Sequence, residues 1–150
     1  MGGYGAIKFG LKYPQLFSLV GSFSGALGAA SITEKEFPGA IGRTIVSIFG
    51  PVGSDIRKAN DLFGLVRKAT PEQIRSLPFI YFDCGTEDLL FANNRDFAEL
   101  LLAKNIRHEF RQLPGGHTWS YWNSQLKEFL ELAGGRLNAE TRRNQTAPLS

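Results

Sequence analysis

Asp88 and His117 are the two residues whose types and positions most clearly indicate chemistry. Asp88 closes a polar loop after the apolar run 78–84, and His117 follows a proline–glycine turn after the segment 107–113. An acid followed about thirty residues later by a histidine matches the second half of the order serine, acid, histidine. In such a triad the imidazole removes the proton of a serine hydroxyl, and the carboxylate holds the imidazole in the required tautomer. The pair therefore predicts the acid and the base of nucleophilic catalysis.

The serine that such a pair would activate does not occur in the expected pattern. None of the 150 residues belongs to a Gly-x-Ser-x-Gly turn, which places a nucleophile between a strand and a helix. The N-terminal residues are typical of the segment just after the serine of such a turn: Met1 fills its last variable position, Gly2 its last glycine, and residues 3–11 the helix behind it. We expect the nucleophile serine to lie before Met1 and to be absent from this chain.

Three other side chains are candidate nucleophiles, and each has a simpler interpretation. Ser22 and Ser24 lie near glycines, but position 20 is valine and position 22 is serine, so neither fits the turn. They are more typical of a strand end followed by a turn. Cys84 ends a predicted strand, where a free cysteine is usually a small buried hydrophobic residue.

The acid and the base also have structural alternatives. Asp88 could cap the helix that follows it, and Asp83 and Glu87 compete with it as the acid. His117 could be an ordinary turn residue, whereas His108 lies in an alternating segment and is predicted at the surface. The two histidines have no cysteine or acid at ligand spacing, so no metal site is predicted.

The elements that must position Asp88 and His117 alternate between strands and helices. Strands are predicted over 16–24, 78–84 and 107–113, and helices over 2–13, 91–105 and 119–132. This alternation predicts a parallel sheet, in which active sites form in loops beyond the carboxyl ends of the strands. Several glycines in the first helix indicate that another element packs closely against it.

The segment 25–77 is irregular and is predicted to form a cap-like insertion. Short helices are expected over 39–49 and 58–69, and Thr70 followed by Pro71 predicts another helix start. After the last helix, Gly134 and Gly135 predict its end. We expect residues 1–134 to form the folded part and residues 135–150 a disordered tail.

The amino-acid composition excludes several classes of protein. The chain has 43% hydrophobic residues, enough for the core of one domain, and a formal charge of +3 without a basic stripe, which argues against nucleic-acid binding. No run approaches the roughly 18 apolar residues of a membrane span, so no membrane partner is expected. The single Cys84 excludes an internal disulfide and fits the cytoplasm by default, although a disulfide-free secreted protein fits as well.

Three segments together resemble one enzyme family. Residues 1–6, 82–88 and 114–122 resemble the family of α/β-hydrolases known as "Putative esterase", in the family's order and at suitable spacing. That family contains esterase D (S-formylglutathione hydrolase), tributyrin-type and feruloyl esterases and the mycolyltransferases. The similarity runs to about residue 133 and implies the C-terminal portion of an α/β-hydrolase fold, with about three parallel strands.

The resemblance also implies roles for individual residues. Asp88 matches the triad acid, His117 the triad base, and Met1 the residue whose backbone N–H forms half of the oxyanion hole. Trp119 and Trp122 are candidate walls of the substrate pocket, with core packing as the simpler alternative.

The implied activity is hydrolysis of a small carboxylic ester through an acyl-enzyme, without a cofactor. An acyltransferase is the alternative if the acceptor is not water. Because the serine and the first strands are missing, we expect residues 1–134 to be a partial domain that is inactive by itself. A separate N-terminal half or a second copy of the chain is then a candidate partner, and a truncated reading frame or non-catalytic remnant is the rival interpretation.

Overall fold

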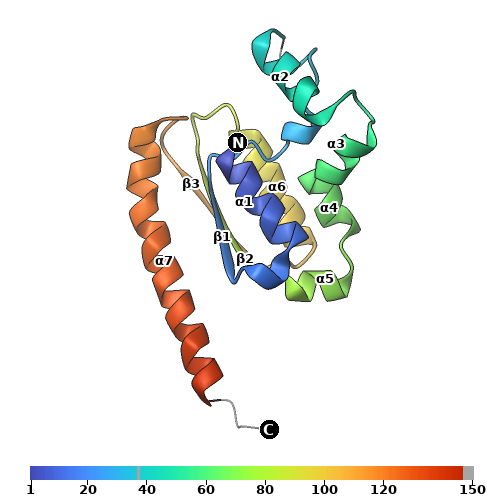
Figure 1. The fold of residues 1–150 in the computed structure, drawn as a ribbon. Helices are drawn as coiled ribbons and strands as arrows, with labels where there is room; N and C mark the ends of the chain where they lie inside the picture. The colour runs from blue at the N-terminus through green and yellow to red at the C-terminus, as the bar shows by residue number, and fades with distance from the viewer. Residues whose placement is uncertain (37, 147–150) are drawn as a thin grey trace.

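A three-stranded parallel sheet forms the centre of the molecule (Figure 1). The structure is a computed structural model that describes residues 1–36 and 38–146. The strands β1 (Leu19–Phe23), β2 (Phe79–Gly85) and β3 (His108–Leu113) lie in the order β1-β2-β3. β2 pairs with both neighbours and every one of its residues is buried. The predicted parallel sheet is therefore confirmed, with the carboxyl ends of all three strands at one edge.

Helices cover both faces of the sheet, so that alternate residues of β2 contact different layers. On one face lie α1 (Gly2–Lys12), α4 (Leu62–Lys68) and α6 (Phe91–Ala103), and α7 (Trp119–Thr146) lies on the other (Figure 1). Phe82 packs against Phe97 of α6, whereas Tyr81 packs against Phe129 of α7. This alternation follows from the two-residue period of a strand, and it explains why β2 is apolar almost throughout.

The first helix lies close to β1 because it contains glycine where the two elements meet. A side chain at Gly10 would come within 2.9 Å of a Val20 methyl carbon, and one at Gly3 would contact the Ser22 hydroxyl and the backbone of Gly25. The glycines therefore allow a short distance between α1 and the sheet. That short distance places the first turn of α1 beside the carboxyl end of β1.

The excursion between β1 and β2 is mostly helical. It contains the 3₁₀ turn η2 (Ala29–Ser31) and the helices α2 (Ala40–Phe49), α3 (Asp55–Asn60), α4 and α5 (Pro71–Ser76). The helix predicted over 58–69 is two helices, because Asp61 has an extended ψ of 103° between them. Thr70 starts α5 as predicted, in a capping box with Gln73.

Buried Arg57 joins the parts of this excursion through backbone carbonyls, with no carboxylate partner among the described residues. Its Nε donates to the Gly50 carbonyl at 2.8 Å, and its Nη1 donates to the carbonyls of Ala30 and Ile32 at 2.9 and 2.7 Å. These bonds join η2, the end of α2 and α3. They hold α2 at the end of the molecule where the strands terminate (Figure 1).

Two predicted boundaries differ from the structure. The strand predicted from residue 16 begins at Leu19, because Pro14–Leu16 form the 3₁₀ turn η1. The predicted helix end at Gly134 and Gly135 is wrong, since α7 continues through both glycines to Thr146. The Arg136 guanidinium lies over the Phe79 ring and keeps the helix against the sheet beyond the glycines. Of the tail predicted over 135–150, residues 147–150 lie outside the described residues.

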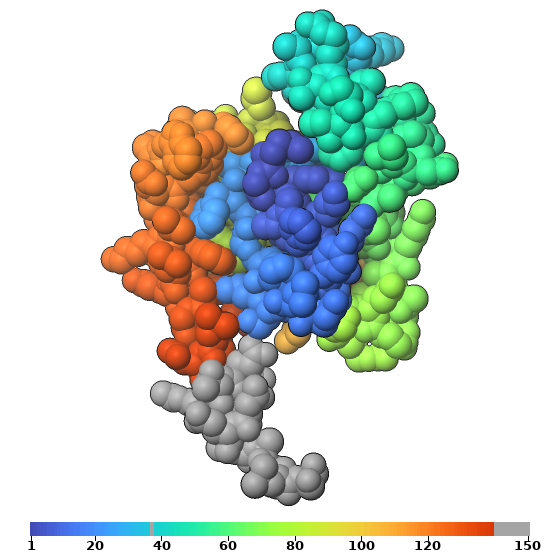
Figure 2. Space-filling view, in the orientation of Figure 1, coloured from blue at the N-terminus to red at the C-terminus, as the bar shows by residue number. Residues whose placement is uncertain are grey.

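None of the helices in the described residues is long and apolar enough to cross a membrane. In the space-filling view, the N-terminal end of α1 lies at the surface between the start of α7 and the helix α2 (Figure 2). The candidate catalytic residues lie around this end of the molecule.

Candidate active site

Asp88 and His117 meet at the carboxyl edge of the sheet. The Nδ1 atom of His117 lies 2.9 Å from Oδ2 of Asp88, a hydrogen-bond distance. The Asp88 side chain is 1% exposed and the His117 side chain 52% exposed. With Nδ1 bonded to a buried carboxylate, the Nε2 atom of the imidazole is free to exchange a proton at the surface. The structure thus has the geometry of an acid and base pair at the two positions predicted from the sequence.

The carboxylate of Asp88 is held by both of its oxygens. Oδ1 accepts a hydrogen bond from the Leu90 backbone N–H at 2.9 Å, while Oδ2 contacts His117. The cap residue of α6 is Leu90, so Asp88 stabilises the turn before that helix rather than its first turn. The structural and the catalytic interpretations of Asp88 are therefore compatible, because each uses a different oxygen.

Backbone contacts fix the His117 loop to the Asp88 loop. The Thr86 N–H donates to the Leu113 carbonyl at 2.9 Å, and the Glu87 N–H donates to the Gly115 carbonyl at 3.0 Å. Gly85 has no side chain where the Gly115 carbonyl contacts it, and a Cβ atom there would overlap that oxygen. Gly115 has a φ of +140°, a conformation that favours glycine. Neither glycine was predicted as a positioning residue from the sequence, although their place beside the two loops was a usable signal.

Two tryptophans lie beside the imidazole. The Trp122 ring meets the His117 ring edge to face, with centroids 4.8 Å apart. The Trp119 and Trp122 rings also meet edge to face, with centroids 5.1 Å apart. Trp119 is 76% exposed, so it is not a core residue. The indole Nε1 of Trp122 is buried and has no hydrogen-bond partner among the described residues.

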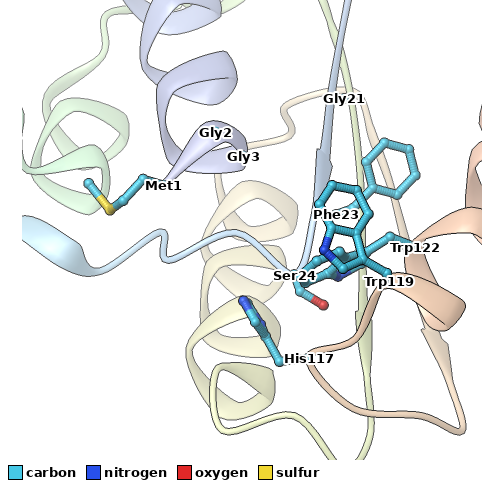
Figure 3. A pocket seen from close by; sticks show the side chains of 9 residues that line it. All are labelled: Met1, Gly2, Gly3, Gly21, Phe23, Ser24, His117, Trp119 and Trp122. Carbon is cyan, nitrogen blue, oxygen red and sulfur yellow. The ribbon is translucent and has the colours of Figure 1, made fainter.

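A cleft of about 410 Å³ connects these tryptophans to the start of α1 (Figure 3). Its walls are formed by Met1, Gly2, Gly3, Gly21, Phe23, Ser24, His117, Trp119 and Trp122. Met1 is the cap residue of α1, and the first N–H groups of a helix have no partner within it. Such a helix end attracts negative charge, so the cleft combines a proton acceptor with a favourable site for an anion.

The alternative nucleophiles are poorly placed for attack. Ser22 is completely buried beneath α1, and its hydroxyl has no hydrogen-bond partner in the described chain. Ser24 lines the cleft but is 3% exposed, and its φ of 46° is in the left-handed region. Cys84 is fully buried, and burial together with the nearby Asp88 charge raises the pKa of its thiol to about 12. The Cys84 thiol is therefore protonated at neutral pH and unreactive.

The competing acids have other surroundings. Asp83 is buried on the α7 side of β2, where its Oδ2 accepts a hydrogen bond from the Tyr81 hydroxyl at 3.1 Å. Glu87 is exposed.

His108, predicted at the surface, is half-buried, and its Nδ1 lies 2.8 Å from the Ile106 carbonyl oxygen. Within the described ranges, no group of three or more His, Cys, Asp or Glu side chains could hold a metal ion.

Both a protein family and individual proteins of known sequence are similar to this chain. The family model described as "Putative esterase" matches residues 1–132. An acetyl esterase of Caldicellulosiruptor saccharolyticus is 34% identical over 135 residues, which cover 87% of this chain and 50% of that protein.

Solved structures from Staphylococcus aureus are similar as well. An S-formylglutathione hydrolase matches with a TM-score of 0.69 and 25% identity, covering 88% of this chain and 50% of that one. A fluorophosphonate-binding serine hydrolase matches with a TM-score of 0.71 and 26% identity, covering 87% and 50%. The chain thus spans about half the length of these relatives, and its sheet and helices have the α/β-hydrolase arrangement.

Proposed function

Because the chain belongs to the "Putative esterase" family, we propose that it supplies the acid and the base of a serine carboxylic-ester hydrolase. The observation that carries the proposal is the 2.9 Å contact between His117 Nδ1 and the buried Asp88 carboxylate. The contact supports the roles of triad acid and base because it uses Nδ1 and leaves Nε2 of His117, a residue that lines the cleft, as the nitrogen for a serine proton.

The reaction proceeds through an acyl-enzyme. His117 Nε2 removes the proton of a serine hydroxyl, and the serine oxygen attacks the carbonyl carbon of the ester. When the bond between that carbon and the alcohol oxygen breaks, His117 returns the proton to the leaving alcohol. Water then attacks the acyl-enzyme with the same proton transfers, and the acid and the free serine are released. Asp88 stabilises the imidazolium that forms in each half of the reaction.

The start of α1 supports a second role. The tetrahedral intermediate carries negative charge on the former carbonyl oxygen, and backbone N–H groups at a helix start stabilise such a charge. Met1 occupies this position and lines the same cleft as His117. We assign the Met1 backbone nitrogen to half of the oxyanion hole, in a protein in which a peptide bond precedes it.

We further propose that the nucleophile lies outside these 150 residues. Ser22, Ser24 and Cys84 are too deeply buried to suit attack, and the Gly-x-Ser-x-Gly pattern does not occur. The length comparison supports this, since the relatives are about twice as long. The chain alone then has the acid and base but not the attacking atom.

The test compares this chain with the same chain extended by whatever is encoded upstream of Met1. We expect Gly-x-Ser in frame there, no hydrolysis of p-nitrophenyl butyrate by the 150 residues, and hydrolysis by the extended protein. His117→Ala in the extended protein lowers kcat by about 10⁴ to 10⁶-fold, since triad members act as a unit. His108→Ala is the matched control and leaves kcat unchanged.

Two outcomes contradict the proposal. Turnover by the 150 residues that His117→Ala abolishes places the nucleophile inside the chain, with Ser24 the first to substitute. An upstream sequence without such a serine favours a non-catalytic remnant.

A further inference from the structure

A second cleft opens on the other side of His117. It has a volume of about 570 Å³, within the range of sites for small molecules. Helix α2 and the loop after Asp88 provide most of its walls, and Met1 and His117 line it as they line the first cleft. The residues around it are Met1, Ala26, Ile32, Ala40, Ile41, Thr44, Ile45, Ile48, Asp88, Leu89, Leu90 and His117.

The walls of the second cleft are aliphatic. Apart from Asp88 and His117, which bond to each other, none of its lining residues carries an ionisable side chain. A charged or strongly polar group among these aliphatic side chains, away from Met1 and His117, would lose water without gaining a partner, which is unfavourable. The cleft therefore suits an uncharged apolar group.

Helix α2 has apolar side chains beyond those that the core requires. Ile45 and Phe49 are buried in the core cluster. Ile41 and Ile48 line the cleft but remain 63% and 51% exposed, and Leu89, which lines it as well, is 93% exposed. Exposed aliphatic side chains gathered in a cleft beside a proton acceptor are typical of a binding site.

The two clefts meet at the same imidazole. An ester carbonyl carbon has two substituents, the acyl chain and the alkoxy group, so each can occupy one cleft while the carbon lies beside His117. The first cleft is bounded by glycines and aromatic rings, and the second by isoleucine and leucine. The differing walls separate the two groups by size and shape.

We propose that the α2 cleft binds an unbranched aliphatic group of the ester, and that Ile41 and Ile48 determine how well longer chains bind. This inference rests on the proposed esterase function. It predicts a preference for esters with a medium-length alkyl chain over acetates of small alcohols.

The test measures binding rather than turnover, so it can use the 150-residue chain itself. Methyl hexanoate, hexyl acetate and methyl acetate are titrated while backbone amide NMR signals are followed. We expect methyl hexanoate, hexyl acetate or both to bind at least about tenfold more tightly than methyl acetate, because each buried methylene adds apolar contact. The shifted signals are expected in α2 and at Leu89.

Serine variants with a matched control test whether α2 side chains bind the alkyl chain. Ile41→Ser and Ile48→Ser are each expected to weaken binding of the longer ester by about three- to tenfold. Ile56→Ser on α3 is the control, because Ile56 is 57% exposed and does not line the cleft. All three positions are more than half exposed, and unchanged circular dichroism checks that the variants remain folded.

Several results overturn the inference: equal affinity for all three esters, shifts confined to Trp119 and Trp122, or affinity unchanged by both serine variants. A dimer that either variant dissociates would show instead that a second copy covers α2. Failure of the esterase proposal is distinguishable, because it leaves alkyl binding intact while the extended protein has no hydrolytic activity.

Discussion

At the scale of single residues, the buried carboxylates of Asp83 and Asp88 differ in their hydrogen-bond partners. Asp88 has a hydrogen-bond partner on each oxygen, the Leu90 N–H on Oδ1 and the His117 imidazole on Oδ2. Asp83 accepts a hydrogen bond from the Tyr81 hydroxyl on Oδ2, and its Oδ1 has no partner within hydrogen-bond distance in the described residues. Burial raises the pKa of Asp83 from 3.8 to about 6. The Tyr121 hydroxyl and the Arg111 charge lower its pKa, but less than burial raises it. Asp83 therefore costs the fold stability when it ionises, whereas Asp88 has partners for its charge.

Asp83→Asn is expected to stabilise the chain at pH 8 and not at pH 4. Between the unfolded pKa near 3.8 and the folded pKa of about 6, the folded state binds more protons, so stability falls as pH rises. Removing the ionisation restores up to about 3 kcal/mol above pH 6. Urea unfolding at both pH values measures this. Asp55→Asn is the control, because the Asp55 side chain is 99% exposed. A gain of equal size at both pH values would contradict the assignment to ionisation.

At the scale of elements, α1 contains glycines with two different roles. A Cβ atom at Gly3 would lie 2.9 Å from the Gly25 Cα atom, whereas a Cβ atom at Gly5 would meet nothing within 4 Å. The close approach at Gly3 is needed to bring the helix start to the cleft. The glycine at position 5 serves no such contact and only lowers helix propensity.

Gly3→Ala and Gly5→Ala are therefore expected to have opposite effects on the free energy of unfolding. Gly5→Ala raises it by about 0.5 to 1 kcal/mol, since alanine is a better helix former. Gly3→Ala lowers it by about 1 to 3 kcal/mol, because the backbone of Gly25 must move. Urea unfolding of the two variants measures both values. Changes of the same sign would mean that α1 does not pack on the sheet through Gly3.

These elements also show what the sequence could predict. The strand and helix order, and with it the meeting of Asp88 and His117, followed from apolar periodicity and from the rule that parallel strands end at one edge. The α2 cleft could not be predicted from such patterns. Arg57 positions this region by donating to the carbonyls of Gly50, Ala30 and Ile32, and no local sequence pattern reveals these contacts. The end of α7 was missed since the contact of Arg136 with Phe79 is likewise tertiary.

At the scale of the whole molecule, the sheet has an unpaired edge at β1. Among the described residues β1 pairs only with β2, and backbone groups of alternate β1 residues point away from that partner. Leu16 and Phe17, just before the strand, are 68% and 38% exposed. An open apolar edge of this kind favours pairing with another strand, from the rest of a longer protein or from a second copy.

The 150-residue chain is therefore expected to self-associate as its concentration rises, and charges beside β1 are expected to reduce this. Combining Leu16→Lys with Phe17→Lys places like charges at the entrance to the edge strand, where they repel each other in an edge-to-edge pair. Sedimentation velocity over a hundredfold range of concentration, on the order of 1 to 100 µM, measures the effect. Leu102→Lys is the control, since Leu102 is 71% exposed on α6, away from β1. A chain that stays monomeric throughout, or that responds equally to the α6 substitution, would show that the β1 edge does not drive association. If association does occur through β1, extending the chain upstream of Met1 should abolish it, because the added strands would occupy the same edge.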